Sequence, residues 1–459
     1  MVNPTILIMY DPLKDRSPGK NTPYPNSYWA DTTSEAPQND GVLEADIDVE
    51  VAIIGAGYTG ISCALHLAEE HNIKSHVLEA NQTAWGCSGR NAGFVLKSTG
   101  RKPYSAMLKQ WGTEVTHQIY DEVCQGVDTV NNLIVRIGDQ TGIDCEVQSK
   151  GYLRIAHKPS MISGLKAQSE LLKNEFGYDT EILSSEDLKE NYFDSKNAFG
   201  AIRFPDGYGI NPLKLAWGYQ SLARQSGVKF HIGSPVTQWE QQNNKTILHT
   251  PKGKVTAKKV VIATNGYTPN HFHSSIDNRT LPVLSQIIVT EPLTESQLSE
   301  TKFQTGNVVM DTRALKYYFR KLPDNRILFG GRGAISGKDA EDPFFANRLL
   351  NVLKQNFPAL QSIKYNYSWS GWISISLDDL PHICQADEQG NILYSAGYCG
   401  NGVSFSVQAG KRLAEKVAGV EVPDIPFYNK QLPVFPLAKF RRVGQWGYFY
   451  YGRVKDRWF

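Results

Sequence analysis

A glycine-rich turn, Gly55-Ala56-Gly57-Tyr58-Thr59-Gly60, carries the strongest chemical signal in the chain. It follows an apolar run at 49–54 and precedes an amphipathic stretch at 59–69, so we predict a strand, a turn and a helix. In such a turn the first glycine permits the tight bend, and the second lets the backbone approach a pyrophosphate. The third allows close packing of helix on strand. Free N–H groups and a partial positive charge at the helix start favour phosphate. The motif therefore predicts a dinucleotide site.

An acidic residue, Glu79, ends the next predicted strand (75–79) about 20 residues after the turn, where a carboxylate can bind ribose hydroxyls. This favours FAD or NAD over NADP. A second small-residue loop follows at 86–93 and contains a hydroxyl and a guanidinium. Such a loop suits a second approach to the pyrophosphate and to a flat ring beyond it, which a plain NAD dehydrogenase does not need there. Taken alone, the loop also fits an ordinary turn.

Two more strand-to-turn passages occur later in the chain. The strand at 392–396 runs through a glycine-rich turn into a predicted helix at 403–418. The start of that helix could direct its dipole at the negative charge that a flavin accumulates on reduction. The strand at 260–263 leads into Thr264-Asn265-Gly266, which could close over the cofactor. Each passage alone fits an ordinary turn equally well.

The alternation of helical and strand-like segments predicts an α/β protein with two discontinuous domains. We expect a Rossmann-type FAD-binding domain of the glutathione-reductase-like kind, built from 48–105, 200–270 and 370–425. Strand-rich segments at 106–199 and 271–369 predict a second, α+β substrate domain on a mainly antiparallel sheet. Within it we expect helical periodicity at 105–145 and a helix near 343–356.

Both ends of the chain differ from these domains. Residues 1–47 are rich in Pro, Asn, Asp and Ser and lack periodicity, so we expect an irregular lead-in. Its apolar run at 4–10 is too short for a signal sequence. Residues 426–459 form an aromatic and basic tail. A membrane-surface or docking role is conceivable for it, but the near-neutral charge favours a tail packed on its own domain.

Composition excludes several classes of function. The 459 residues carry a net charge of +2, which argues against nucleic acid as a partner. The six cysteines form no CxxC pair and no zinc-like cluster, so we expect no metal and reduced thiols. No run approaches the roughly 18 apolar residues of a spanning helix. We therefore expect a cytoplasmic protein whose oligomeric state the sequence leaves open.

In order and spacing, the motifs of nearly the whole chain resemble those of the D-amino-acid oxidase-like family of FAD oxidoreductases. The resemblance rests on Tyr58-Thr59-Gly60 with 64–68, Ser88-Gly89-Arg90-Asn91, Tyr318-Phe319-Arg320 with 328–331, Trp369-Ser370-Gly371, Leu380-Pro381 and the 397–403 turn. It implies FAD along the glycine turn, with Glu79 on the ribose and Val236 at the adenine. Relatives with covalent flavin use a Cys that would fall near Gly371, where none stands, so we expect non-covalent FAD. The family often has His where this chain has Asn401.

The motifs and the resemblance together assign cofactor binding to these positions: Gly55, Gly57, Tyr58, Thr59, Gly60, Glu79, Ala80, Gly86, Ser88, Gly89, Arg90, Asn91, Val236, Gly266, Gly397, Gly400, Asn401, Gly402 and Val403.

Four residues are candidates for the catalytic, substrate-side positions. Arg320 and Arg332 could bind a substrate carboxylate, or each could form a surface or structural ion pair. Tyr318 and Trp369 could belong to an aromatic box for an amine cation, or to the core. Sarcosine-oxidase-like members place a Lys where Ser404 stands here. This difference weakens the hypothesis that the substrate is a simple amino acid.

The resemblance implies hydride removal from the carbon–nitrogen bond of a small amine, γ-glutamylputrescine-like or another primary or secondary amine. The imine would be hydrolysed, and O2 would be reduced to hydrogen peroxide. Two alternatives remain: an amino-acid dehydrogenase or oxidase that uses quinone or another acceptor, and a flavin-bound interaction module without catalysis.

Overall fold

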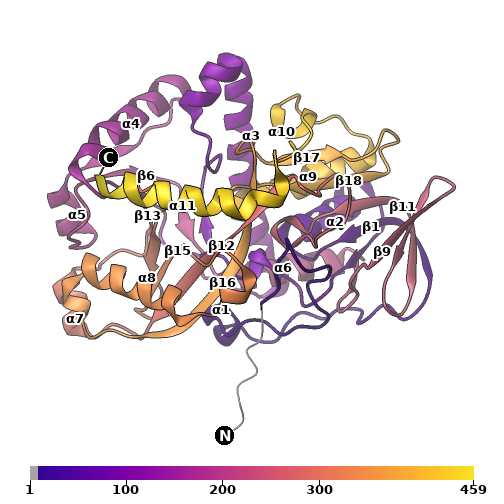
Figure 1. Cartoon of the computed structure of the whole chain (residues 1–459), viewed down its shortest axis with the longest axis horizontal. Helices are drawn as coiled ribbons and strands as arrows, with labels where there is room; N and C mark the ends of the chain where they lie inside the picture. The colour runs from indigo at the N-terminus through magenta and orange to yellow at the C-terminus, as the bar shows by residue number, and fades with distance from the viewer. Residues whose placement is uncertain (1–8, 459) are drawn as a thin grey trace, which may run out of the picture.

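Two eight-stranded sheets organise the chain, and helices from distant segments cover them (Figure 1). The computed structural model describes residues 9–458; residues 1–8, which include most of the apolar run at 4–10, and residue 459 lie outside the described part. The predicted α/β class is confirmed, and so is the mainly antiparallel second sheet.

The first sheet is centred on β1, which pairs in parallel with β2 on one side and β11 on the other. The second half of β1 is buried, as expected for an apolar strand inside a parallel sheet. The strand order is β17-β18-β11-β1-β2-β8, with β9 and β10 as a hairpin beside β11. Their bounds are β1 Ile47–Ile54, β2 Ser75–Leu78, β8 Lys229–His231, β9 Gln238–Gln242, β10 Lys245–His249, β11 Lys254–Ile262, β17 His382–Gln385 and β18 Ile392–Ala396.

Four helices pack together over this sheet: α2 (Tyr58–His71), α3 (Tyr104–Thr141), α6 (Pro212–Gln225) and α9 (Gly402–Ala418). Helix α3 is interrupted at Gly112, where φ is 78°. Helices α2 and α9 approach closely, because Gly410 of α9 lies against Ser62 and the backbone of Thr59. The Ser62 hydroxyl donates a hydrogen bond of 2.7 Å to the Val407 carbonyl at the same crossing.

The second sheet has the order β16-β12-β15-β14-β13-β4-β6-β5 and only one parallel pair in its described part, β4 with β13. Its core includes Phe193, Phe303, Phe319, Phe329 and Phe357. The strands are β4 Tyr152–Ile155, β5 Glu181–Leu183, β6 Ala201–Phe204, β12 Thr280–Thr290, β13 Val308–Asp311, β14 Tyr318–Lys321, β15 Ile327–Arg332 and β16 Tyr365–Ser376. The associated helices are α4 Ile162–Phe176, α5 Ser185–Asn191, α7 Glu295–Thr301 and α8 Pro343–Asn356. A two-stranded sheet pairs β3 (Phe94–Val95) with β7 (Tyr208–Gly209).

Three of the expected domain assignments differ from the packing. Residues 106–141, expected in the second domain, form most of α3, which packs with α6 and α9 over the first sheet. Two limits between the sheets also differ. Strand β6 pairs with β4 and β5, so the second sheet reaches past residue 200. Strand β16 pairs with β12 from Tyr365 to Ser376, so the limit expected at 370 moves beyond this strand. Continuous antiparallel pairing sets both limits, and the glycine-rich motifs do not reveal it.

The two ends of the chain are more regular than expected. Tyr28–Thr32 form a short helix, α1, and the tail contains α10 (Pro426–Asn429) and α11 (Arg441–Trp458). Asp11 of the lead-in and Arg442 of α11 form an ion pair of 2.8 Å, which ties the two ends together. Among residues 9–458, no helix is long and apolar enough to span a membrane. Figure 1 shows α11, in yellow, running across the front of the second sheet.

We predict that Gly410→Ala lowers the free energy of unfolding by about 1–3 kcal/mol through overpacking. Its added Cβ would lie 2.6 Å from both the Ser62 Cβ and the Thr59 carbonyl oxygen. Gly138→Ala is the matched control, since a Cβ there meets nothing within 4 Å, and it should gain up to about 1 kcal/mol. Denaturant unfolding at fixed FAD concentration measures both. Equal effects of the two substitutions would contradict a tight α2–α9 crossing.

Candidate functional site

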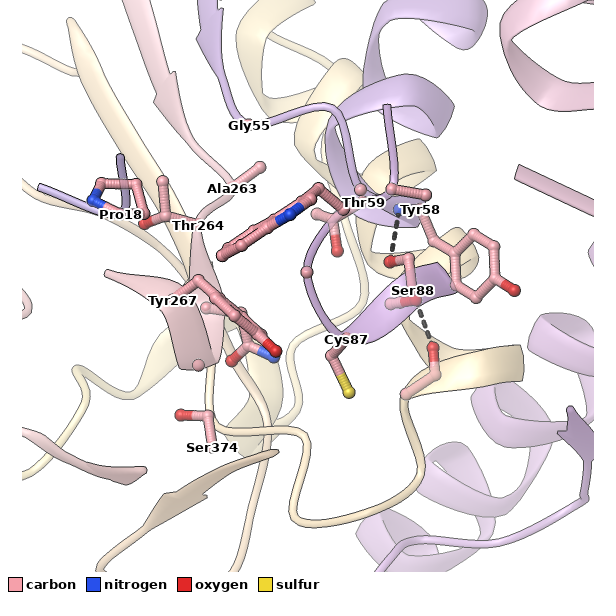
Figure 2. Close-up of a pocket in the computed structure, with 18 of the residues that line it drawn as sticks. Pro18, Gly55, Tyr58, Thr59, Cys87, Ser88, Ala263, Thr264, Tyr267 and Ser374 are labelled. Carbon is pink, nitrogen blue, oxygen red and sulfur yellow. Dashed lines mark hydrogen bonds between the residues drawn. The ribbon is translucent and has the colours of Figure 1, made fainter. Parts of the chain in front are cut away.

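A cavity of about 1240 Å³, including its open mouth, runs from the carboxyl ends of β1 and β2 to the seam between the two sheets. Its size exceeds the usual range for a small metabolite and suits a dinucleotide. Figure 2 shows the Gly55 turn, Ser88, Tyr267 and Ser374 arranged around the same space. Open α/β sheets commonly bind their ligands at this end of the strands.

The Gly55 turn leaves backbone N–H groups exposed to the cavity. Gly55 has φ of 106°, and a Cβ there would lie 2.9 Å from the Ala263 carbonyl oxygen. Gly57 precedes α2 and gives no side-chain cap to the first N–H groups of the helix. The Ser88 hydroxyl accepts the Tyr58 N–H at 3.0 Å and brings the second small-residue loop beside this turn (Figure 2). The arrangement fits a pyrophosphate.

Glu79 has a structural role as well as a binding role. Its carboxylate accepts the Ala56 N–H at 2.8 Å and the Asn81 N–H at 2.9 Å. It also lines the cavity, so the remaining lone pairs can accept hydrogen bonds from ribose hydroxyls. Desolvation by the surrounding protein raises the pKa of this carboxyl, although the backbone hydrogen bonds act in the opposite direction.

Aromatic side chains form one wall of the cavity. The rings of Trp85 and Tyr267 meet edge to face at 5.5 Å, and Tyr10 stacks on Tyr267 at 6.2 Å. Trp85 and Tyr267 line the cavity, whereas Arg90 lies behind Trp85 with its guanidinium 4.4 Å from the centre of that ring. Arg90 donates its hydrogen bonds to the carbonyls of Trp85 and Ser370.

The far end of the cavity lies between the two sheets. Ile373 and Ser374 of β16 line it from one side, and Gly400, Gly402 and Val403 line it from the other. Helix α9 begins at Gly402 without a side-chain cap, so its first N–H groups and its positive dipole end are available to a ligand. A flat ring system that becomes negatively charged on reduction would be stabilised here.

Most of the predicted cofactor residues line this cavity. They are Gly55, Gly57, Tyr58, Thr59, Glu79, Ala80, Gly86, Ser88, Asn91, Val236, Gly266, Gly400, Gly402 and Val403. The other five are not among its lining residues: Gly60, Gly89, Arg90, Gly397 and Asn401.

Close packing or a hydrogen bond holds each of the other four positions, as the contacts with Trp85 and Ser370 hold Arg90. Gly60 lies against the Gly55 carbonyl, and a Cβ on Gly89 would lie 2.5 Å from the Ala84 carbonyl oxygen. Gly397, with φ of 84°, packs on Ser376. The Asn401 amide turns away from the cavity and donates to the Ser98 carbonyl. These contacts show what holds the residues in place, and their assignment to cofactor binding stays a prediction.

Several lining residues were not predicted from the sequence. The lead-in supplies Pro18, and the aromatic wall uses Trp85 and Tyr267. No periodicity or glycine pattern marks these three positions. The turn at 397–403 includes Tyr398, for which the sequence predicted no role. Its hydroxyl contacts the Thr59 hydroxyl at 2.6 Å and the Ser395 hydroxyl at 2.7 Å, which links α2 to the turn between β18 and α9.

Arg320 of β14 and Trp369 of β16 are buried side chains, and neither is a cavity-lining residue. Arg320 donates to the Gln148 amide oxygen at 2.6 Å and to the Ile210 carbonyl at 2.5 Å. Desolvation lowers the pKa of its guanidinium to about 9. The Trp369 indole donates to the Arg90 carbonyl at 2.8 Å. The Trp369 contact holds the loop at 90–93, and the Arg320 contacts hold the chain at Gln148 and Ile210.

Tyr318 and Arg332 are less enclosed, and they do not form a box with Trp369. The Tyr318 hydroxyl contacts the Ser285 hydroxyl at 2.7 Å, and its ring meets Phe94 edge to face at 5.9 Å. The Arg332 guanidinium faces α11, 5.7 Å from the centre of the Phe449 ring. The four substrate-side candidates share one sheet but point to different surroundings.

The FAD dependent oxidoreductase family matches residues 50–416 of the chain. Gamma-glutamylputrescine oxidoreductase of Escherichia coli (strain K12) is 31% identical over 423 residues, which cover 92% of this chain and 96% of that protein. Glycine oxidase of Bacillus subtilis (strain 168) is 22% identical over 81% of this chain and 94% of its own length. Among solved structures, glycine oxidase from Geobacillus kaustophilus superposes with a TM-score of 0.71 at 19% identity, covering 85% of this chain and 99% of that one.

We predict that Glu79→Gln weakens FAD binding and lowers the free energy of unfolding by about 1–3 kcal/mol. The amide keeps one acceptor oxygen, so its NH2 group must face a backbone N–H that the carboxylate now accepts. Fluorescence titration of the FAD-free protein measures the affinity. Glu50→Gln, at an exposed position of the neighbouring strand β1, is the control. Unchanged FAD affinity in Glu79→Gln would contradict the assignment of Glu79 to the ribose of FAD.

Proposed function

This chain belongs to the FAD-dependent oxidoreductase family, and we propose that it is an oxidase of a small primary or secondary amine, with γ-glutamylputrescine-like amines as the leading substrate class. FAD is its cofactor, and its family acts on carbon–nitrogen bonds of amines and amino acids. The similarity to the Escherichia coli gamma-glutamylputrescine oxidoreductase extends over 92% of the chain and is the observation that carries the substrate proposal.

The chain offers distinct groups to each part of the cofactor. Glu79 would hold the adenosine ribose, the N–H groups at the start of α2 would hold the pyrophosphate, and those at the start of α9 would face the ring end. Bound FAD would supply the acceptor for a hydride. The aromatic wall and the residues of β16 line the cavity and would place the second sheet beside the ring end.

The proposed reaction balances with water and O2 as co-reactants. A primary amine loses a hydride and a proton to give an imine, which water converts to an aldehyde and ammonia. O2 takes up the two electrons and two protons and leaves as hydrogen peroxide. The amine must be neutral to lose a hydride, so a surrounding of low polarity favours the reactive form.

We place the substrate beside the second sheet, with Tyr318 as the side chain that contacts it. Tyr318 is only partly buried and keeps an apolar ring surface beside Phe94. Trp369 and Arg320 then act as positioning residues, because they hold the chain around Arg90 and Gly93 without lining the cavity. Arg332 would act from the α11 side of the sheet, on a charged group at the far end of the substrate.

An anaerobic mixture of the FAD-loaded protein with a panel of amines tests the proposal. We expect γ-glutamylputrescine to bleach the visible FAD absorbance, and air to restore it with formation of hydrogen peroxide. Putrescine, sarcosine, proline, glycine and both enantiomers of common amino acids complete the panel. Bleaching that only an added quinone reverses would replace the oxidase with a dehydrogenase. FAD that no amine bleaches would overturn the amine proposal.

The Tyr318→Phe variant separates a substrate contact from a role in folding. It removes only the hydroxyl that contacts Ser285, so FAD content should stay unchanged while the bleaching rate or KM for the active amine changes. Ser285→Ala, which removes the other partner of that contact, is the matched control. Equal kinetics in Tyr318→Phe and the wild type would remove this residue from the substrate site.

We also predict that FAD is bound without a covalent link. Cys87 is the one cysteine of residues 9–458 among the lining residues, and burial raises the pKa of its thiol to about 11, so the unreactive thiol form predominates near neutral pH. Acid precipitation should therefore release all yellow colour into the supernatant. A fluorescent protein band on a denaturing gel would contradict this, and Cys87→Ser would identify the attachment point.

A further inference from the structure

Helix α11 has two faces of opposite character. Its inward face is fixed to the second sheet: Arg442 donates to the Pro282 carbonyl at 2.9 Å, and Gly452 packs on Leu315. Asp456 accepts the backbone N–H groups of Ala314 at 2.6 Å and Leu315 at 3.0 Å. These contacts define the orientation of the helix, since both of its ends are held.

The outward face of α11 is apolar and aromatic. We define it as Val443, Trp446, Tyr450, Val454 and Trp458, residues whose spacing of three or four places them on one side of the helix. Val443 is 62% exposed, Trp446 and Tyr450 are each 61% exposed, and Trp458 is 70% exposed. The rings of Trp446 and Tyr450 stack on each other at 6.1 Å. The preceding segment continues the surface with Leu437 and Phe440, which are 78% and 62% exposed.

Basic residues border this face. Helix α11 has five basic residues and one acidic residue, Asp456, which is turned inward to hold Ala314 and Leu315. We define the basic border as Arg453, Lys455 and Arg457, all exposed. None of these three forms a salt bridge with an acidic side chain of residues 9–458. The helix alone is more positive than the whole chain, whose net charge is +2.

We propose that the outward face of α11 docks the protein on an anionic lipid bilayer. A helix that lies in the bilayer interface combines Trp and apolar residues on one side with Lys and Arg at its border. Trp and Tyr rings favour the headgroup level because they are apolar with one polar atom. The helix lies on the surface and does not cross it, in agreement with the lack of a spanning helix in residues 9–458.

A second copy of the chain fits this face less well. A two-fold interface brings the same patch of both subunits together, and the outward side of α11 offers the basic residues of the other copy no acidic partner, because Asp456 is turned inward. Juxtaposed like charges oppose association. A surface of phosphate headgroups meets both properties at once, since it offers negative charge to the border and an apolar layer to Trp446 and Trp458.

The test uses FAD-loaded full-length protein and sedimentation with two kinds of vesicle, phosphatidylcholine alone and an equimolar mixture with phosphatidylglycerol. We expect binding to the anionic vesicles and little to the neutral ones, with a loss of binding near 0.5 M salt, where charges are screened within about 4 Å. Arg453→Gln/Lys455→Gln/Arg457→Gln should weaken binding roughly a hundredfold, given about 1 kcal/mol for each basic residue.

Two further variants complete the test. Lys245→Gln/Lys254→Gln/Lys258→Gln removes the same charge from exposed positions of strands β10 and β11 and should leave binding unchanged. Trp446→Ser/Tyr450→Ser should also abolish stable binding while FAD content stays constant. Equal binding to neutral and anionic vesicles, or no binding to either, would overturn the proposal. So would a wild-type dimer that Trp446→Ser/Tyr450→Ser converts to a monomer, because a second copy would then cover the face.

Discussion

The carboxylate of Glu79 holds together the three elements on which the cofactor cavity depends. It accepts N–H groups from the turn after β1 and from the chain after β2, so the ends of both strands and the start of α2 keep one geometry. The group lines the cavity, and desolvation by the surrounding protein raises the pKa of its carboxyl, because the charged form lacks part of the solvation it has in water. A ligand that donates hydroxyl groups to it relieves that deficit. Binding of the ribose and stability of the turn are thus two effects of one interaction.

At the opposite end, the cavity depends on contact between the two sheets. Tyr398 links α2 to the β18–α9 turn through hydroxyl contacts, and Ile375 at the end of β16 forms a bridge with the same residue. A substrate bound beside the second sheet is therefore adjacent to the turn that precedes α9. The close α2–α9 packing then couples the pyrophosphate end to the ring end through two helices that meet at Gly410.

Local patterns predicted most of the first sheet and its glycine turns. β1 ends in a continuous apolar run, α2 and α9 each begin directly after a glycine-rich turn, and Gly55 has a positive φ, so their roles are encoded within a few residues. Local patterns do not reveal the direction in which a side chain points. Arg90 and Asn401 stand inside cofactor motifs, yet Trp85 and the Ser98 carbonyl draw them away from the cavity. Pro18 reaches the cavity from the lead-in, and no local signal marks such a contact.

Helix α11 forms in a tail for which the sequence predicted no helix. Gly444, Gly447 and Gly452 each disfavour a helix by about 1 kcal/mol relative to Ala. The contacts of Arg442 and Asp456 offset this at the two ends, and Gly452 permits the close approach to Leu315. The aromatic residues of the outward face, Trp446, Tyr450 and Trp458, take no part in these contacts, although they occupy that face at helical spacing. Selection for a packed tail alone would favour polar residues there, as on other solvent-facing helices. A docking helix requires attachment to its protein on one side, here to the second sheet, and an apolar, cationic surface on the other.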